Sequence, residues 1–300
     1  MHVFVTGATG WIGSAVVKDL IAAGHTVTGL SRSAEKAPAL AATGAEVLHG
    51  TLQDLEVLKA AAAKADGVIH LAFNHDFSRF ADNGADEQRA IAAIGSALEG
   101  SDRPLVVASG VALLSPGKLA TEDSAPLAGG EALPRNPEAA VAALRARGVR
   151  ATAVRLAPSV HGRGDKGFVP RVIAFAREKG VSPYVGDGGN RWPGVHRIDA
   201  ARMFRLALER GAEGGPFHAV ADEGVPFRAI AEVVGKHLGV PVVSQTPDEA
   251  AEHFGWFTRF AAIDAPASSE KTRAVLGWQP TQLGLLADIE ANYFVREAAK

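Results

Sequence analysis

Residues 2–13 read HVFVTGATGWIG, an apolar run that passes directly into three glycines spaced three residues apart. The run predicts a buried strand, and the apolar spacing of WIGSAVVKDLIAAG after it predicts a helix. A tight turn between the two needs glycine, which tolerates positive φ and has no Cβ to keep a phosphate away. The N–H groups and positive dipole end of the helix then attract the anion. Gly7, Gly10 and Gly13 therefore predict a dinucleotide site, with a purely structural turn as the alternative.

The end of the second expected strand bears on which dinucleotide binds. In proteins that bind NAD, a carboxylate about 20 residues after the glycines holds the ribose 2′-hydroxyl. Residues 29–33 read GLSRS, so Ser31 takes that place and Arg32 follows it. A 2′-phosphate then meets no carboxylate, and a guanidinium can bind it through two hydrogen bonds. We therefore expect NADP(H) in preference to NAD(H), with a solvated surface arginine as the alternative.

Short apolar runs alternate with helical patterns up to residue 156. The expected strands are 2–6, 25–30, 45–50, 67–72, 104–109 and 151–156, and the expected helices are 34–43, 54–64, 84–99 and 136–147. Continuous apolar strands indicate a sheet that is covered on both faces. The alternation therefore predicts an α/β fold built on a doubly wound parallel sheet of the Rossmann type.

The pattern changes after residue 156. Residues 159–167 and 185–194 are expected to be loops, 216–220 one more strand, and 226–300 helices separated by turns. We therefore expect a nucleotide-binding domain of residues 1–156, to which 190–222 return. A smaller C-terminal substrate-binding lobe of residues 157–189 and 223–300 would complete the molecule. Ligands of such proteins lie in the crevice at the carboxyl ends of the strands.

The composition excludes several classes of function. Hydrophobic residues make up 47% and charged residues 21%, and a net charge of −2 gives no attraction to nucleic acid or an acidic membrane. The absence of cysteine excludes disulfides, thiolate metal sites and cysteine nucleophiles. No apolar run approaches the roughly 18 residues of a membrane helix, and the N-terminus lacks the pattern of a signal peptide. We expect a cytoplasmic protein with a small-molecule substrate and no nucleic-acid or membrane partner.

Six segments together carry a family resemblance. They are TGATGWIG (6–13), HGTLQD (49–54), VIHLA (68–72), VRLAPSVHG (154–162), GDGGNRWPGVHRIDAA (186–201) and LGWQP (276–280). In this order they resemble the extended short-chain dehydrogenase/reductase family, the nucleotide-sugar epimerase and dehydratase group, over nearly the whole chain. The resemblance implies a Rossmann fold and a nicotinamide cofactor. Thr51 stands where that family has an aspartate at the adenine, and His161 where it has a tyrosine.

The resemblance fails at the catalytic pair. The family uses Tyr-x-x-x-Lys, in which the lysine lowers the pKa of the proton-donating tyrosine. Alignment back from residues 145–156 places Gly130 and Pro134 at these positions, and no tyrosine occurs between residues 2 and 183. Ser109 matches the family's catalytic serine, although a shift of one residue would place Gly110 there. The chain thus resembles an atypical member of the family.

The resemblance also implies a set of cofactor contacts. These are Gly7, Thr9, Gly10, Trp11, Ile12, Gly13, Ser31, Arg32, Thr51, Leu52, Leu71, Ala72 and Phe73. The candidates to replace the catalytic tyrosine are Ser109, His75 and His161, and Asp76 is a further polar residue near the strand ends. His75 follows the fourth expected strand in FNHDFSRF (73–80) and has an ordinary pKa near neutrality. A hydrogen-bonded or surface histidine is the alternative for both His75 and His161.

These observations predict an NADP(H)-dependent oxidoreductase that acts on a small carbonyl, imine or related metabolite with a non-standard proton donor. A non-catalytic NADP(H)-binding redox sensor, or a non-redox isomerase or lyase on the same fold, are the alternatives. His and Asp residues show no metal-ligand spacing, so we expect no metal. A serine hydrolase is disfavoured because no Gly-x-Ser-x-Gly occurs. Alanine-rich faces on helices 84–99 and 136–147 are compatible with a homodimer.

Overall fold

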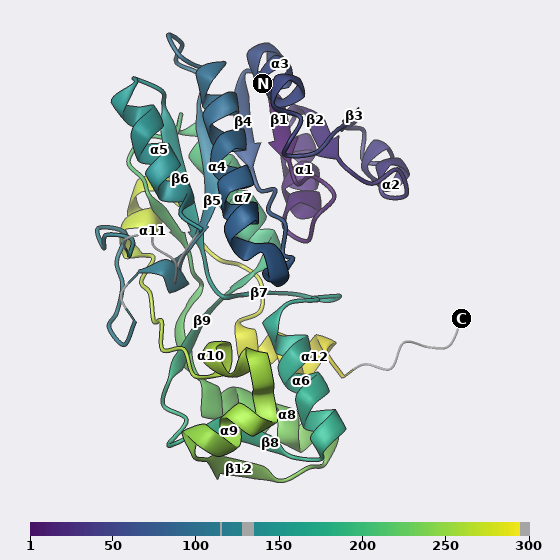
Figure 1. Cartoon of the computed structure of the whole chain (residues 1–300), viewed down its shortest axis with the longest axis vertical. Helices are drawn as coiled ribbons and strands as arrows, with labels where there is room; N and C mark the ends of the chain where they lie inside the picture. Colours follow the sequence, from purple (N-terminus) through teal and green to yellow (C-terminus); the bar gives the residue numbers. More distant parts are fainter. Residues whose placement is uncertain (115, 128–134, 295–300) are drawn as a thin grey trace.

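The fold is organised by a seven-stranded parallel sheet (Figure 1), in a computed structural model that describes residues 1–114, 116–127 and 135–294. Its strands are β1 (His2–Thr6), β2 (Thr26–Ser31), β3 (Glu46–His49), β4 (Gly67–His70), β5 (Leu105–Gly110), β6 (Ala151–Leu156) and β10 (Phe217–Ala219). They lie in the order β10-β6-β5-β4-β1-β2-β3. From β1 the chain runs to β2 and β3 on one side, and after β3 it returns to β4 on the other side of β1. The strand order therefore reverses between β1 and β4, and a ligand is expected in the crevice at the carboxyl ends of these two strands.

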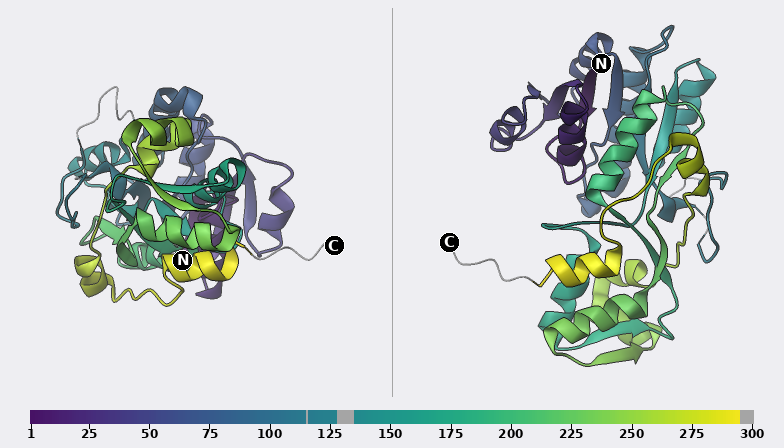
Figure 2. Two further views of the ribbon diagram at one scale, coloured as in Figure 1. Left: turned by 90° about the horizontal axis from the view of Figure 1, so that it is seen from below. Right: turned by 180° about the vertical axis from the view of Figure 1, so that it is seen from behind.

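Helices cover both faces of this sheet, as Figure 2 shows from two further sides. The helices are α1 (Gly13–Ala22), α2 (Ala37–Ala41), α3 (Leu55–Lys64), α4 (Phe80–Ser96), α5 (Pro137–Ala146) and α7 (Arg197–Glu209). Along β1, Val3 and Val5 belong to the same apolar cluster as Phe204 of α7. Phe4, between them, belongs to the opposite cluster with Ile91 of α4. The predicted doubly wound α/β fold, with apolar residues on both faces, is confirmed.

The remainder of the chain forms smaller sheets and helices, most of which lie in the lower part of Figure 1, whereas α11 (Glu270–Leu276) lies against α7 and β10 of the large sheet. A three-stranded sheet has the order β11-β9-β7, and β12 pairs with β8. The strands are β7 (Ser159–His161), β8 (Ser182–Val185), β9 (Arg191–His196), β11 (Asp222–Pro226) and β12 (Val242–Gln245). The helices are α6 (Phe168–Lys179), α8 (Phe227–Leu238), α9 (Pro247–Phe254), α10 (Thr258–Ala261), α11 (Glu270–Leu276) and α12 (Leu285–Asn292). Trp192, Phe227, Phe254 and Phe257 are buried in the core of this part.

Two expectations about this region were wrong. Residues 159–167 and 185–194 were expected to be loops, but the first range contains β7, and the second contains the last residue of β8 and the first four residues of β9. The glycines and charges concealed a buried strand, because Trp192 and Val195 of β9 are fully buried. Residues 226–300 also contain β12 in addition to helices.

The helix expected at 84–99 begins earlier, at Phe80. A short 3-10 turn over Phe77–Arg79 precedes it, and Asp76 caps this turn by accepting a hydrogen bond from the Ser78 N–H. The turn runs directly into α4, so most of the segment 73–80 connects β4 to a helix. Two further 3-10 turns lie at Val111–Leu113 and Gly255–Phe257. Among the described residues, no helix has both the length and the apolar character needed to cross a membrane.

The glycine turn is close-packed against its own backbone and against the end of β4. Gly7 has φ +68°, and a Cβ placed on it would lie 2.8 Å from the amide nitrogen of Ala72. A Cβ on Gly13 would overlap the carbonyl oxygen of Gly7, which also accepts the Gly10 N–H at 2.9 Å. Only glycine fits at these two positions without moving the backbone.

We expect Gly13→Ala to lower the free energy of unfolding by about 1–3 kcal/mol, because the added methyl must displace the Gly7 carbonyl. Urea unfolding followed by circular dichroism measures the change. Gly110→Ala is the matched control, since a Cβ there has its nearest neighbour, the carbonyl oxygen of Leu156, at 3.8 Å. Equal stability of the two variants would contradict the close-packed turn.

Candidate functional site

The glycine turn presents unpaired backbone donors at the carboxyl end of β1. Within the described residues, the N–H groups of Trp11, Ile12 and Gly13 donate to no protein acceptor, whereas those of Gly10 and Ser14 donate to the carbonyls of Gly7 and Gly10. They stand at the start of α1, where the helix dipole is positive. A diphosphate is the kind of group that such donors bind. The residues present therefore fit the expected dinucleotide.

The end of β2 lies on the side where the adenosine of such a dinucleotide would extend. Ser31 is buried, and its hydroxyl donates to the carbonyl of Ser33 at 3.0 Å. Arg32 is exposed and forms no ion pair with any described residue. The structure thus places a solvent-facing guanidinium, and no carboxylate, directly after this strand.

The other expected cofactor contacts lie at the same edge of the sheet. Thr51 is exposed and donates from both its N–H and its hydroxyl to Asp54, at 2.7 and 2.9 Å, and these bonds lower the Asp54 pKa. Leu71 and Ala72 are half-buried and donate their N–H groups to the Thr6 hydroxyl at 3.2 and 3.3 Å. Thr9, Leu52 and Phe73 are half-buried, and Gly10 is exposed.

His70 is the fully buried last residue of β4 at this edge of the sheet. Its Nδ1 lies 3.0 Å from the Thr6 hydroxyl oxygen. That oxygen accepts two amide N–H groups, so it donates its own proton to Nδ1 of a neutral imidazole. Burial, with the nearby charge of Arg135, lowers the His70 pKa to about 3. His70 is therefore neutral at physiological pH.

Arg135 lies between the ends of β4 and β5. Its guanidinium pairs with the buried carboxylate of Glu87 in α4, with N–O distances of 2.6 and 2.9 Å. It also donates to the carbonyl of Ala108 at 3.3 Å and lies 4.3 Å from the ring centroid of Phe73. Burial raises the Glu87 pKa, and the charge of Arg135 offsets part of that rise. Sequence reasoning missed Arg135, although a cation directly after Pro134 was a usable signal.

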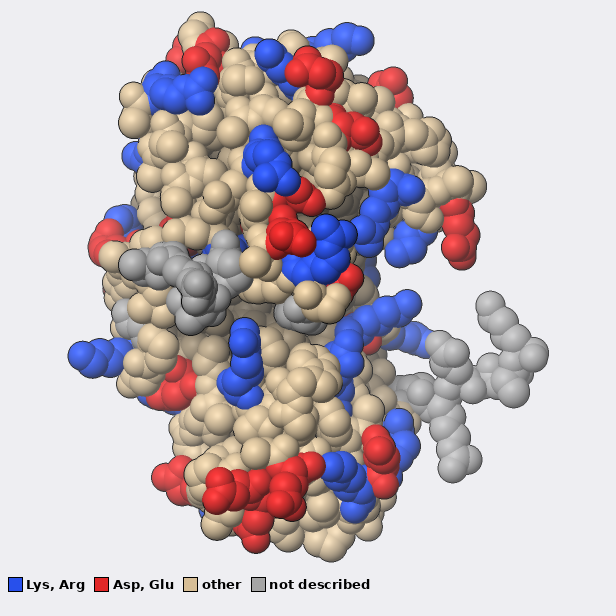
Figure 3. All heavy atoms as spheres, viewed as in Figure 1, with Lys and Arg blue, Asp and Glu red and all other residues tan. Residues whose placement is uncertain are grey.

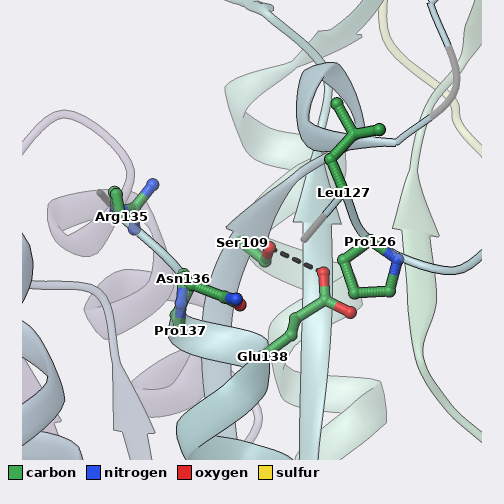
Figure 4. A pocket seen from close by; sticks show the side chains of 7 residues that line it. All are labelled: Ser109, Pro126, Leu127, Arg135, Asn136, Pro137 and Glu138. Carbon is green, nitrogen blue, oxygen red and sulfur yellow. Dashed lines mark hydrogen bonds between the residues drawn. The ribbon is translucent and has the colours of Figure 1, made fainter. Parts of the chain in front are cut away.

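Ser109 belongs to a buried polar chain that starts at the end of β5. Its hydroxyl donates to Glu138 of α5 at 2.8 Å (Figure 4). Arg155 of β6 holds the same carboxylate through two N–H groups, at 2.9 and 2.8 Å. Arg155 also contacts Nε2 of His218 at 3.2 Å, and His218 donates from Nδ1 to the carbonyl of Ser268 at 2.7 Å. Burial lowers the His218 pKa, so a neutral ring accepts from Arg155.

A small cavity of about 10 Å³ lies between these groups, which is room for about one water molecule. Figure 4 shows Ser109 and Glu138 directed toward each other on one side of it. Its lining is Ser109, Pro126, Leu127, Arg135, Asn136, Pro137 and Glu138. Gly130 and Pro134, the positions aligned with the family's tyrosine and lysine, lie outside the described residues.

The two histidine candidates lie in different surroundings. His75 has an exposed side chain on the loop after β4, and its ring packs edge-on against Phe73 at 5.1 Å. Packing of the ring and the charge of Arg135 lower the His75 pKa. The neighbouring Asp76 accepts the N–H and hydroxyl of Ser78, which lower the Asp76 pKa. His75 thus contacts Phe73, which also packs against Arg135, and Arg135 reaches the carbonyl of Ala108 beside Ser109.

His161 is fully buried on β7. Its Nδ1 lies 2.8 Å from a carboxylate oxygen of Asp288 in α12, and its Nε2 has no partner among the described residues. Its ring is 5.5 Å from that of His196. Hydrogen bonds from His161 and Asn292 lower the Asp288 pKa against the opposing effect of burial. The pair joins α12 to the three-stranded sheet.

Known proteins resemble this chain along most of its length. The family described as NAD(P)H-binding matches residues 7–181. An uncharacterized protein of Schizosaccharomyces pombe is 47% identical, over 98% of this chain and 100% of its own. The 4-hydroxy-2-methyl-3-oxo-4-farnesyl-3,4-dihydroquinoline-1-oxide ketoreductase of Stigmatella aurantiaca is 28% identical, over 89% of this chain and 84% of its own. The Bordetella bronchiseptica enzyme WbmG, solved in complex with NAD and UDP, shares the fold with a TM-score of 0.74 at 20% identity, covering 97% of this chain and 92% of that one.

The buried His70 makes a testable contribution to pH dependence. Its pKa is about 3 in the folded state and about 6.5 in an unfolded chain, so between these values the unfolded state binds more protons. Folded stability must therefore fall as the pH drops below about 6.5. From pH 7 to pH 5 this one group accounts for about 2 kcal/mol of lost stability.

We expect His70→Gln to lose about that much less stability than the wild type between pH 7 and pH 5. Urea unfolding at the two pH values measures the difference. His237→Gln, which replaces an exposed histidine in α8, should keep the wild-type dependence. An identical loss in wild type and His70→Gln would show that His70 is not held neutral.

Proposed function

The chain belongs to the NAD(P)H-binding family, with a fold of the short-chain dehydrogenase/reductase type, and from this premise we propose that it is an NADP(H)-dependent oxidoreductase. Its substrate would be a small carbonyl, imine or related metabolite. The family match and the reductase names of its distant relatives support an oxidoreductase with a nicotinamide cofactor. The ketoreductase relative favours a carbonyl among these substrates.

One arrangement of hydrogen-bond donors supports the cofactor more than any other feature. At the start of α1, three backbone N–H groups have no acceptor among the described residues, and the exposed Arg32 follows the neighbouring strand β2. The first feature suits a diphosphate, and the second suits a 2′-phosphate. Figure 3 shows several Lys and Arg side chains at the waist of this face, with Asp and Glu side chains beside them and a larger acidic group near the lower end. The exposed Arg32 thus favours an anionic ligand locally despite the net charge of −2.

A bound nicotinamide supplies or accepts a hydride at the substrate carbon. In the direction of reduction, negative charge then develops on the substrate oxygen, and a donor must stabilise it. Arg135 suits this task, because Glu87 and Phe73 hold its guanidinium at the sheet edge and its Nη1 donates to no acceptor in the part of the chain that the structure describes. A guanidinium keeps its protons in proteins, so Arg135 would polarise the oxygen without protonating it.

The proton must come from another group. Ser109 already donates its hydroxyl proton to Glu138, and Arg155 holds that carboxylate in place. The serine oxygen can therefore orient a substrate or water by accepting a hydrogen bond. His75 is an exposed titratable side chain at this edge, and the neighbouring Asp76 has a lowered pKa that makes it a poorer proton donor, so we assign this role to His75. His161, buried against Asp288, would have a structural role: it would hold β7 against α12 in the expected substrate-binding lobe.

Paired titrations of NADPH and NADH, followed by nicotinamide fluorescence, test the cofactor. We expect wild type to bind NADPH more tightly than NADH. Arg32→Ala should weaken NADPH about 10- to 100-fold, because a charge-assisted bond to the 2′-phosphate is lost, and leave NADH within about twofold. NADH is the internal control. Equal losses for both cofactors would refute the assignment of Arg32, and binding of neither would refute the proposed function.

Turnover of NADPH across a panel of small aldehydes, ketones and imines tests the reaction. We expect the rate of reduction to rise as the pH falls below 6.5, because His75 has a lowered pKa and donates a proton only when charged. His75→Gln should lose this acidic rise and at least 10-fold in kcat while its Kd for NADPH is unchanged. The control is His237→Gln. A His75→Gln enzyme with the wild-type pH profile would exclude His75 as the donor.

A further inference from the structure

Arg197 brings a charge to the glycine turn from a distant part of the sequence. It is the first residue of α7, and its guanidinium carbon lies 4.0 Å from the ring centroid of Trp11. Its Nη2 also donates to the hydroxyl of Ser14, in the first turn of α1, at 3.1 Å. The helices α1 and α7 pack side by side, so their N-terminal ends meet here. The arginine therefore lies beside the unpaired N–H groups of Trp11, Ile12 and Gly13.

The surroundings confine this side chain. Gly162 has φ +146°, and a Cβ on it would lie 3.2 and 3.3 Å from Cγ and Cδ of Arg197. On the other side, the Trp11 ring is held by a hydrogen bond from its Nε1 to the carbonyl of Val160 at 2.8 Å. The stem of Arg197 thus passes between a glycine backbone and a fixed indole. Its conformational freedom is reduced before any ligand arrives.

The charge of Arg197 is not balanced by the protein. On the same helix, Arg202 pairs with Asp199, and Arg205 pairs with Asp19 and Glu209. Arg197 is half-buried and forms no ion pair with any described residue. Burial lowers its pKa, which is the cost of a cation with no carboxylate beside it. A cation in this state next to unpaired N–H groups is suited to an anion.

We propose that Arg197, stacked on Trp11, binds the diphosphate of the dinucleotide together with the N–H groups of the glycine turn. The proposal rests on the proposed nicotinamide site and adds a second cation to it. Arg32 would bind the 2′-phosphate, which only NADP(H) carries. Arg197 would bind the diphosphate, which NADPH, NADH and ADP-ribose share. The two arginines therefore differ in which ligands depend on them.

Titrations of Arg197→Met with NADPH, NADH and ADP-ribose test this division. We expect affinity for all three ligands to fall by a similar factor, about 10- to 100-fold, because a charge-assisted hydrogen bond to phosphate is lost in each. Arg197→Lys keeps the charge without the planar stack and should lose less. Arg210→Met removes one exposed charge just beyond the other end of α7 and should bind as wild type. Near-ultraviolet circular dichroism and the Tm confirm that each variant is folded.

Wild-type affinity of Arg197→Met for NADH and ADP-ribose would overturn the proposal, and so would a loss confined to NADPH. If Arg197→Met fails to fold, Arg197→Lys decides: unchanged affinity for all three ligands counts against the site, and a shared loss supports it. None of these outcomes for the Arg197 variants bears on the proposed function, provided that the wild type binds NADPH. Failure of the wild type to bind either cofactor would overturn the proposed function and this site together.

Discussion

The structure depends on a backbone contact between two glycines. At the start of α1 the chain passes so close to the carbonyl of Gly7 that no side chain fits at Gly13, and Gly7 itself lies against Ala72 at the end of β4. This contact sets the direction of α1 and leaves its first N–H groups without acceptors among the residues that the structure describes. It also brings β1 and β4 together at the edge where His70, Arg135 and Ser109 lie. The candidate site is therefore a consequence of how closely two backbone segments can approach.

Two ion pairs with largely buried carboxylates lie at this edge of the sheet. Glu87 with Arg135, and Glu138 with Arg155, each remove two charges from water, which is unfavourable unless the remaining donors and acceptors are satisfied. Ser109, Ala108, Glu122 and His218 provide most of those partners. The two ion pairs therefore add little to the free energy of unfolding, but they fix the positions of the side chains at this edge. They hold one guanidinium, one hydroxyl and one cavity in defined positions.

The sequence predicted the central sheet well because its strands are continuous apolar runs, as in VIHLA (68–72), and its first helix follows a glycine turn. It failed for β9, where RWPGVH mixes a charge, a proline and a glycine with the buried Trp192. The same limit applies to the site. Arg135 with Glu87, and Arg197 with Trp11, are separated by long stretches of chain, and only tertiary packing brings them together. Similarly, the burial of His161 depends on Asp288, in the last helix, which no local pattern indicates.

The hydrogen bond from Trp11 to Val160 has a consequence for how two distant segments respond to a ligand. It ties the nucleotide turn to β7, a strand of the sheet that leads into the lower part of the molecule. Any ligand that favours one position of the turn must, by thermodynamic linkage, also favour one position of that strand, and the reverse holds equally. A nucleotide bound at the turn would therefore prepare the region opposite it. By the same reciprocity, a ligand that contacts β7 would change the affinity of the turn for the nucleotide.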